Sequence, residues 1–160
     1  MRKTMYVTIG IIAILVILIL TGRKSVHHEI TINSSPEKVW EVLTHVEEYP
    51  EWNPVMELLE GSFKEGSTVN YKFTQDEENQ SEIQAKVIRI VPKETINQKG
   101  GLPLMLTFDH SYTLAPDGNA TKVIIHEDYR GIGVNFWNPK AVEEAYGRLN
   151  KALKERVEKL

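Results

Sequence analysis

The longest hydrophobic run of the chain lies at its start, where residues 5–20 read MYVTIGIIAILVILIL without a charge. Basic pairs flank it, Arg2-Lys3 before and Arg23-Lys24 after. A helix over residues 4–22 would be about 28 Å long, close to the hydrocarbon thickness of a bilayer. The alternative is a cleaved signal peptide, which has a shorter apolar region that ends at small residues of the A-x-A kind. No such site follows Leu20, so the pattern favours a single uncleaved transmembrane helix, 4–22, followed by one domain, 26–160.

The pattern changes to strict alternation between Ser25 and Asn33, which predicts a half-buried strand. The sequence Ser34-Ser35-Pro36-Glu37 then offers a serine N-cap and a proline in the first turn of a helix. Apolar residues spaced for one helix face follow, and the segment Tyr49–Pro54 ends the helix because each proline restricts the residue before it.

Strand-like segments then follow one another, separated by short turn signals. They are Val55–Leu59, Thr68–Thr74, Ser81–Val91, Glu94–Gln98, Leu104–Ala115 and Thr121–Tyr129. The close spacing leaves no room for crossover helices, so the sheet should be antiparallel. After Asn138-Pro139, apolar residues recur every three or four positions, which predicts a long C-terminal helix with one apolar face.

Charge divides the chain into two unequal parts. The first 24 residues hold four of the 19 Lys and Arg and no acid, so 15 basic residues remain against 22 acidic ones, a net charge of −7 for the rest. An acidic domain argues against nucleic-acid binding, which requires a basic surface. The absence of cysteine excludes disulfides, thiolate metal sites and cysteine nucleophiles.

Two motifs resemble a known family. The segments EITINSSPEKVW (residues 29–40) and YPEWNP (residues 49–54) look like the opening of the SRPBCC (START-like) superfamily, which includes the polyketide cyclase/dehydrase group and the birch pollen allergen type. The resemblance covers about residues 26–160. It implies an α+β helix-grip fold, with a seven-stranded antiparallel sheet wrapped around the long C-terminal helix and a cavity for apolar ligands between them. Trp40 and Trp52 are interpreted as packing residues rather than ligand contacts.

If the cavity implied by the resemblance is present, the inward-facing strand residues should line it. Alternation places His110 on one face of its strand with five apolar or aromatic residues, and Glu127 on one face of the last strand, although Ile124 leaves that face ambiguous. The expected lining is Tyr71, Phe73, Leu106, Phe108, His110, Tyr112, Ile125, Tyr129, Tyr146 and Leu149. His110 and Glu127 are the candidates for acid–base chemistry, but ordinary satisfied polar groups of a core remain the favoured interpretation.

Three other motifs do not indicate a metal or cofactor site. His27-His28-Glu29 and His126-Glu127-Asp128 offer at most two ligands on one face of a strand, so we expect no metal site. Gly131-Ile132-Gly133 lacks the third glycine of a dinucleotide loop and is interpreted as a flexible connection, and no cofactor is expected. The loop 130–138 is expected at the mouth of the cavity. The glycine-hinged apolar segment 100–104 is expected to be a lid, a lipid contact or an ordinary hairpin turn.

These observations predict a membrane-anchored domain that binds a hydrophobic small molecule or lipid. The first alternative is a cyclase- or dehydratase-like enzyme acting on an aromatic or polyketide-like substrate, and the second is a regulatory domain that binds a protein partner. The basic pairs on both flanks of the helix hardly discriminate orientation, and a free amino terminus favours the domain outside the cytoplasm.

Overall fold

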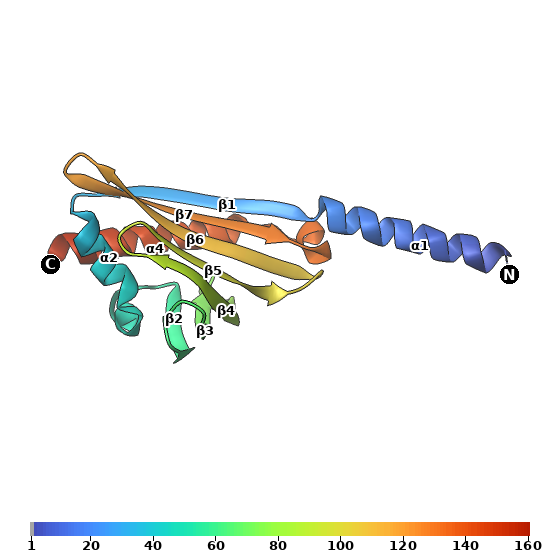
Figure 1. Ribbon diagram of the computed structural model, residues 1–160, viewed down its shortest axis with the longest axis horizontal. Coiled ribbons are helices and arrows are strands. Elements are labelled where there is room, and N and C mark those ends of the chain that lie inside the picture. Colours follow the sequence, from blue (N-terminus) through green and yellow to red (C-terminus); the bar gives the residue numbers. More distant parts are fainter. Residues whose placement is uncertain (1) are drawn as a thin grey trace.

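The sheet and the C-terminal helix form two layers, and an N-terminal helix projects from one end of them (Figure 1). The computed structural model describes residues 2–160. The elements are α1 (Arg2–Thr21), β1 (Arg23–Ile32), α2 (Pro36–Thr44), η1 (Val46–Glu48), α3 (Tyr49–Trp52), β2 (Met56–Gly61), β3 (Thr68–Thr74), β4 (Gln80–Val91), β5 (Thr95–Leu102), β6 (Leu106–Asp117), β7 (Ala120–Arg130), η2 (Ile132–Phe136) and α4 (Lys140–Lys159).

All seven strands form one antiparallel sheet in the order β1-β7-β6-β5-β4-β3-β2. Only β1 and β2 are edges, and the chain crosses between them through α2, η1 and α3. Ser35 caps α2 by accepting a hydrogen bond from the backbone N–H of Lys38, and Pro36 occupies the first turn. The predicted helix-grip architecture, with its seven-stranded antiparallel sheet, is confirmed.

Helix α4 supplies the centre of the core. Its buried side chains recur on one face, as the sequence period predicts, and pack against the inner face of the sheet. These residues are Val142, Ala145, Tyr146, Leu149, Leu153 and Val157. Trp40 and Trp52 pack at the border of the same cluster, consistent with their interpretation as packing residues.

Two local predictions are wrong at the end of the sheet next to α1. Strand β6 begins at Leu106 rather than Leu104, which lies in a turn with a φ of +67°, and β5 extends to Leu102. The alternation of apolar residues continues through this turn, so the pattern alone overextends the strand. The segment after β7 is not a flexible connection but the 3₁₀ helix η2, because its backbone N–H groups at Ile132 and Gly133 donate to the carbonyls of Leu104 and Met105 at 2.8 Å.

Helix α1 is long and apolar enough to cross a membrane, and none of its side chains is buried. It joins the sheet without a linker, since only Gly22 separates it from β1. Asn135 of η2 donates to the Leu18 carbonyl at 2.8 Å and lies 3.0 Å from the Thr21 hydroxyl, and Gly131 donates to the Gly22 carbonyl at 2.9 Å. The last turn of α1 and the Gly22 carbonyl that follows it are thus hydrogen-bonded to the domain.

Candidate functional site

A buried polar cluster lies between the inner face of the sheet and α4. His110 on β6 lies directly opposite Glu127 on β7, and both side chains point toward α4. Tyr146 on α4 donates its hydroxyl to Glu127 Oε2 in a short hydrogen bond, and that hydroxyl lies 3.3 Å from His110 Nδ1. Tyr129 donates to the same carboxylate oxygen at 2.7 Å. His110 Nδ1 and Glu127 Oε2 are 3.6 Å apart. The two candidates for acid–base chemistry therefore converge on one tyrosine hydroxyl.

The tyrosines of this cluster are held in their neutral, donating form. Burial raises the pKa of Tyr146 well above its usual range, and the nearby carboxylate of Glu127 raises it further. Burial and the same carboxylate raise the pKa of Tyr129. Both hydroxyls therefore keep their protons at neutral pH and stabilise a carboxylate that is only 4% exposed.

Removing one of these donors should be costly. We expect Tyr146→Phe to destabilise the protein by about 1–3 kcal/mol, because a buried carboxylate loses a hydrogen bond without gaining water. The measurement is chemical unfolding of the full-length protein in detergent micelles, followed by circular dichroism.

Tyr112→Phe is the matched control for this substitution. Within residues 2–160 the Tyr112 hydroxyl has no hydrogen-bond partner, although the ring is equally buried, so its removal should change stability by less than about 0.5 kcal/mol. Equal losses from the two variants would contradict a specific role for the Tyr146 hydroxyl.

The cluster borders a cavity of about 20 Å³ between the sheet and α4. That volume holds roughly one water molecule. The lining combines polar and aromatic side chains: Tyr49, Met56, Tyr71, Ile83, Ala85, Gln98, Phe108, His110, Tyr112, Glu127 and Tyr146. In this conformation the cavity is too small for a lipid or a polyketide.

A much larger groove begins where two neighbouring strands separate. Pairing of β4 with β5 starts at Ala85 and Gly100, so residues 80–84 and 101–102 diverge. The groove there measures about 550 Å³, within the usual range of small-molecule sites. Ile83 and Phe108 line both the groove and the small cavity, so the two spaces adjoin at these side chains. The Phe108 ring packs on Gly100, where a Cβ atom would lie 2.5 Å from it.

The predicted cavity residues fall into three groups. Tyr71, Phe108, His110, Tyr112 and Tyr146 line the small cavity, and Phe108 and Leu106 line the groove. Phe73, Ile125, Tyr129 and Leu149 line neither and belong to the packed core. For these four the cavity lining stays a prediction, because in this conformation an inward position borders the cavity only where α4 stands away from the sheet.

Sequence reasoning missed Gln98 and Ile83. Gln98 follows Ile96 by two positions on β5, so alternation places this amide on the inner face, and that polar residue at a buried position was an available signal. Nothing in the periodicity of β4 distinguishes Ile83 from an ordinary core residue.

The His-rich triplets of β1 and β7 do not assemble a metal centre. His27 and His126 lie side by side on the outer face, with ring centroids 5.8 Å apart, while Glu127 points inward. Across residues 2–160, no group of three or more His, Cys, Asp or Glu side chains is arranged to hold a metal ion.

Comparisons with known proteins agree with the fold. The family model described as polyketide cyclase / dehydrase and lipid transport matches residues 23–158. No curated protein matches the sequence. Similar solved structures include major latex-like protein 151 from Panax ginseng (16% identity, TM-score 0.70, covering 84% of this chain and 97% of that one). Another is norcoclaurine synthase from Thalictrum flavum in complex with dopamine and hydroxybenzaldehyde (18%, 0.68, 86% and 87%). A third is protein CV1439 from Chromobacterium violaceum (18%, 0.69, 84% and 96%).

Proposed function

Since the chain belongs to the polyketide cyclase / dehydrase and lipid transport family of the SRPBCC superfamily, we propose that it is a membrane-anchored domain that binds a hydrophobic molecule carrying a polar group. The apolar part of the ligand would occupy the groove between β4 and β5. The polar group would reach the cluster of His110, Glu127 and Tyr146.

The observation that carries this proposal is the position of Phe108. Its ring lines both the open, partly apolar groove and the small cavity beside the polar cluster. Because Phe108 is only partly buried and packs on a glycine, rotation of its side chain would connect the two spaces. The combined site then has an apolar entrance and a hydrogen-bonding end, which suits an amphipathic ligand.

Helix α1 is proposed to be a membrane anchor that is not cleaved as a signal peptide. Its length and composition support this role, and so do its hydrogen bonds to η2, since a removed signal peptide would leave the Asn135 side chain without its partners in α1. We propose that the domain lies outside the cytoplasm.

Native mass spectrometry of the full-length protein released from membranes tests ligand binding. We expect the wild-type chain to carry one amphipathic molecule and Phe108→Ala to retain or increase the bound fraction. Phe108→Trp should lose it, because a larger ring blocks the connection. Leu59→Ala on β2, an exposed apolar residue outside the groove, is the matched control and should bind like the wild type.

Two results would contradict the proposal. One is the absence of a bound molecule in both the wild type and Phe108→Ala. The other is a bound fraction that Phe108→Trp leaves unchanged.

A second candidate function is acid–base catalysis on the bound molecule, favoured by the convergence of His110 and Glu127 within 3.6 Å beside the cavity. Glu127→Gln keeps the shape of the side chain and removes its basicity. If the site is catalytic, the molecule recovered by mass spectrometry should change in mass on incubation with the wild type but not with Glu127→Gln. Retention of that molecule unchanged by both proteins would leave binding alone as the function.

A further inference from the structure

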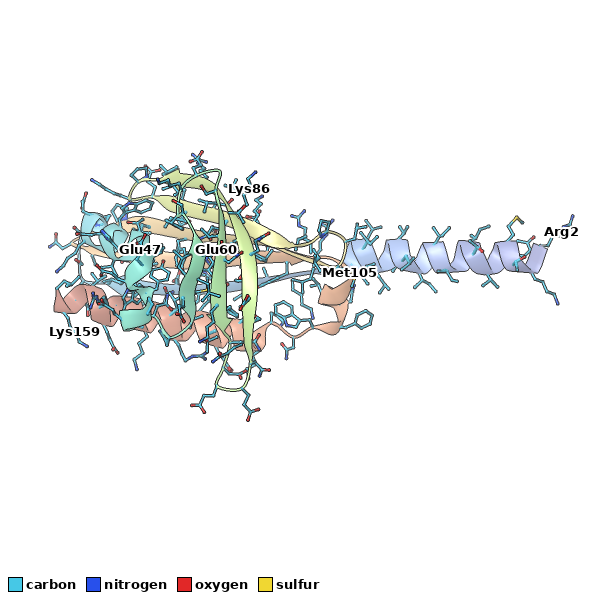
Figure 2. All side chains as sticks on the ribbon, turned by 90° about the horizontal axis from the view of Figure 1, so that it is seen from below. Arg2, Glu47, Glu60, Lys86, Met105 and Lys159 are labelled. Atoms are coloured by element: carbon cyan, nitrogen blue, oxygen red, sulfur yellow. The ribbon has the colours of Figure 1, made fainter. Side chains whose placement is uncertain are left out.

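Exposed apolar side chains gather at the end of the domain that α1 enters. Outside α1, four of the most exposed large apolar residues are Leu102 (70%), Leu104 (64%), Met105 (55%) and Phe136 (79%). Leu102 ends β5, Leu104 and Met105 lie in the β5–β6 turn, and Phe136 ends η2. Hydrogen bonds from η2 to the Leu104 and Met105 carbonyls join the two segments into one surface, called here the apolar tip. Figure 2 shows Met105 beside the junction with α1, whereas Glu47 lies toward the other end of the domain.

The apolar tip is continuous with the last turn of α1. A groove of about 200 Å³ is lined by Ile19 and Leu20 of α1 on one side and by Leu104 and Gly131 on the other. Because α1 is hydrogen-bonded to η2 and joined to β1 by Gly22 alone, the tip cannot move away from the end of the helix without breaking these contacts. A bilayer that contains α1 would therefore reach the tip.

Two unpaired positive charges border the same groove. Arg23 and Arg130 are cross-strand partners on β1 and β7, and both are exposed. Within residues 2–160 neither guanidinium forms an ion pair or a hydrogen bond, and Asp109, whose pKa the charge of Arg130 helps to lower, pairs with Lys99 at 2.7 Å. Like charges opposite each other in a sheet are destabilising unless an anion lies between them. Lipid phosphates at the level of the headgroups would supply that anion.

We infer that this end of the domain is a membrane-docking surface, in which the apolar tip enters the bilayer interface and Arg23 and Arg130 bind lipid phosphates. The inference rests on the proposed role of α1 as an anchor. It adds that the acidic domain is held against the membrane at one fixed end, although its net charge alone would push it away from anionic lipids. Leu102 also lines the groove between β4 and β5, so docking places the entrance of the ligand site at the lipid surface.

Single spin labels test the docking directly, and the absence of native cysteine makes each label unique. The full-length protein is reconstituted into nanodiscs of phosphatidylcholine with phosphatidylglycerol, and collision rates with oxygen and with a nickel complex report depth. Labels at Met105→Cys and Phe136→Cys should show a several-fold higher oxygen-to-nickel ratio than a label at Glu60→Cys, which lies on β2. A label at Ile12→Cys reports on the anchor itself.

The outcomes separate docking from anchoring. If the Ile12 label lies in hydrocarbon while the labels at 105 and 136 are as accessible to nickel as the label at 60, the docking inference is wrong and the anchor stands. If the Ile12 label is itself in water, the proposed anchor fails, and the docking inference with it.

The arginines have their own readout. In the double variant Arg23→Gln/Arg130→Gln, the depth of the Met105 label should lose its dependence on phosphatidylglycerol. Arg89→Gln, an exposed arginine of β4 near the opposite turn, is the matched control and should retain that dependence. If the label depth in the double variant still depends on phosphatidylglycerol, the two arginines do not bind lipid phosphates.

Discussion

Above pH 10 the protein should lose stability steeply and unfold within roughly one to two pH units. The cause is a group of five tyrosines whose pKa values are raised above 10.0 by burial. They are Tyr49, Tyr71, Tyr112, Tyr129 and Tyr146, and the remaining tyrosine, Tyr6, belongs to α1.

The direction follows from proton linkage. Below pH 10 these tyrosines are neutral in both the folded and the unfolded chain, so their raised pKa values do not change the free energy of unfolding there. Above pH 10 the unfolded chain releases their protons while the folded chain retains them, and stability falls as pH rises. Each tyrosine contributes about 1.4 kcal/mol per pH unit, so five contribute about 7 kcal/mol per pH unit. That loss exceeds the total stability of many domains within two units.

A titration of the full-length protein in detergent micelles checks this expectation. The ultraviolet absorbance of tyrosinate and the circular dichroism of the sheet should change together in one cooperative transition. Tyr112→Phe should leave stability at neutral pH unchanged and reduce the alkaline slope by one proton in five. Tyrosinate absorbance that rises over several pH units while the native circular dichroism persists would contradict the burial of these side chains.

The substitution Gly131→Ala should destabilise the protein by about 3 kcal/mol or more. Gly131 has a φ of +134°, a conformation that residues with a side chain rarely adopt. A Cβ atom there would also lie 2.4 Å from the Met105 carbonyl oxygen. Three segments cross at this glycine: the end of α1 through Gly22, the β5–β6 turn and the start of η2. The added methyl group must push at least two of them apart.

Gly66→Ala is the matched control for this prediction. Gly66 also has a positive φ, +86°, but nothing lies within 4 Å of the added Cβ, so this variant should lose only about 1–2 kcal/mol. The difference between the two free energies of unfolding, measured by denaturant in micelles, isolates the effect of the crossing. If Gly131→Ala loses no more than Gly66→Ala, the three segments are not in tight contact.

Much of the architecture was predictable because it depends on local pattern. Strict alternation identified β1, apolar runs between turn signals identified the other strands, and the three-to-four spacing identified α4, since a buried face must be apolar whatever its partner. The capping serine and the first-turn proline at Ser35-Pro36 located the start of α2. The family resemblance in residues 29–40 and 49–54 supplied the strand arrangement that periodicity alone does not contain.

The errors concentrate where two segments determine each other. Leu104 continues the apolar alternation of β6 but lies in a turn, because its carbonyl and that of Met105 bind η2. Gly131-Ile132-Gly133 looks like a flexible connection in the sequence, yet contacts with α1 and the β5–β6 turn order it into a helix. In both cases the contacting segments are far apart in sequence, so the pattern of one segment does not reveal the other.

The sequence by itself determined the class of each element, the inward face of most strands, the acidic character of the domain and a helix able to cross a membrane. These are properties of periodicity and composition, which need no partner. Only the tertiary structure decided that Tyr146 joins His110 to Glu127, that Phe108 borders both the small cavity and the groove, and that α1, η2 and the β5–β6 turn lie together. Each of these depends on residues far apart in sequence meeting at a few ångströms, and such distances follow from packing rather than from pattern.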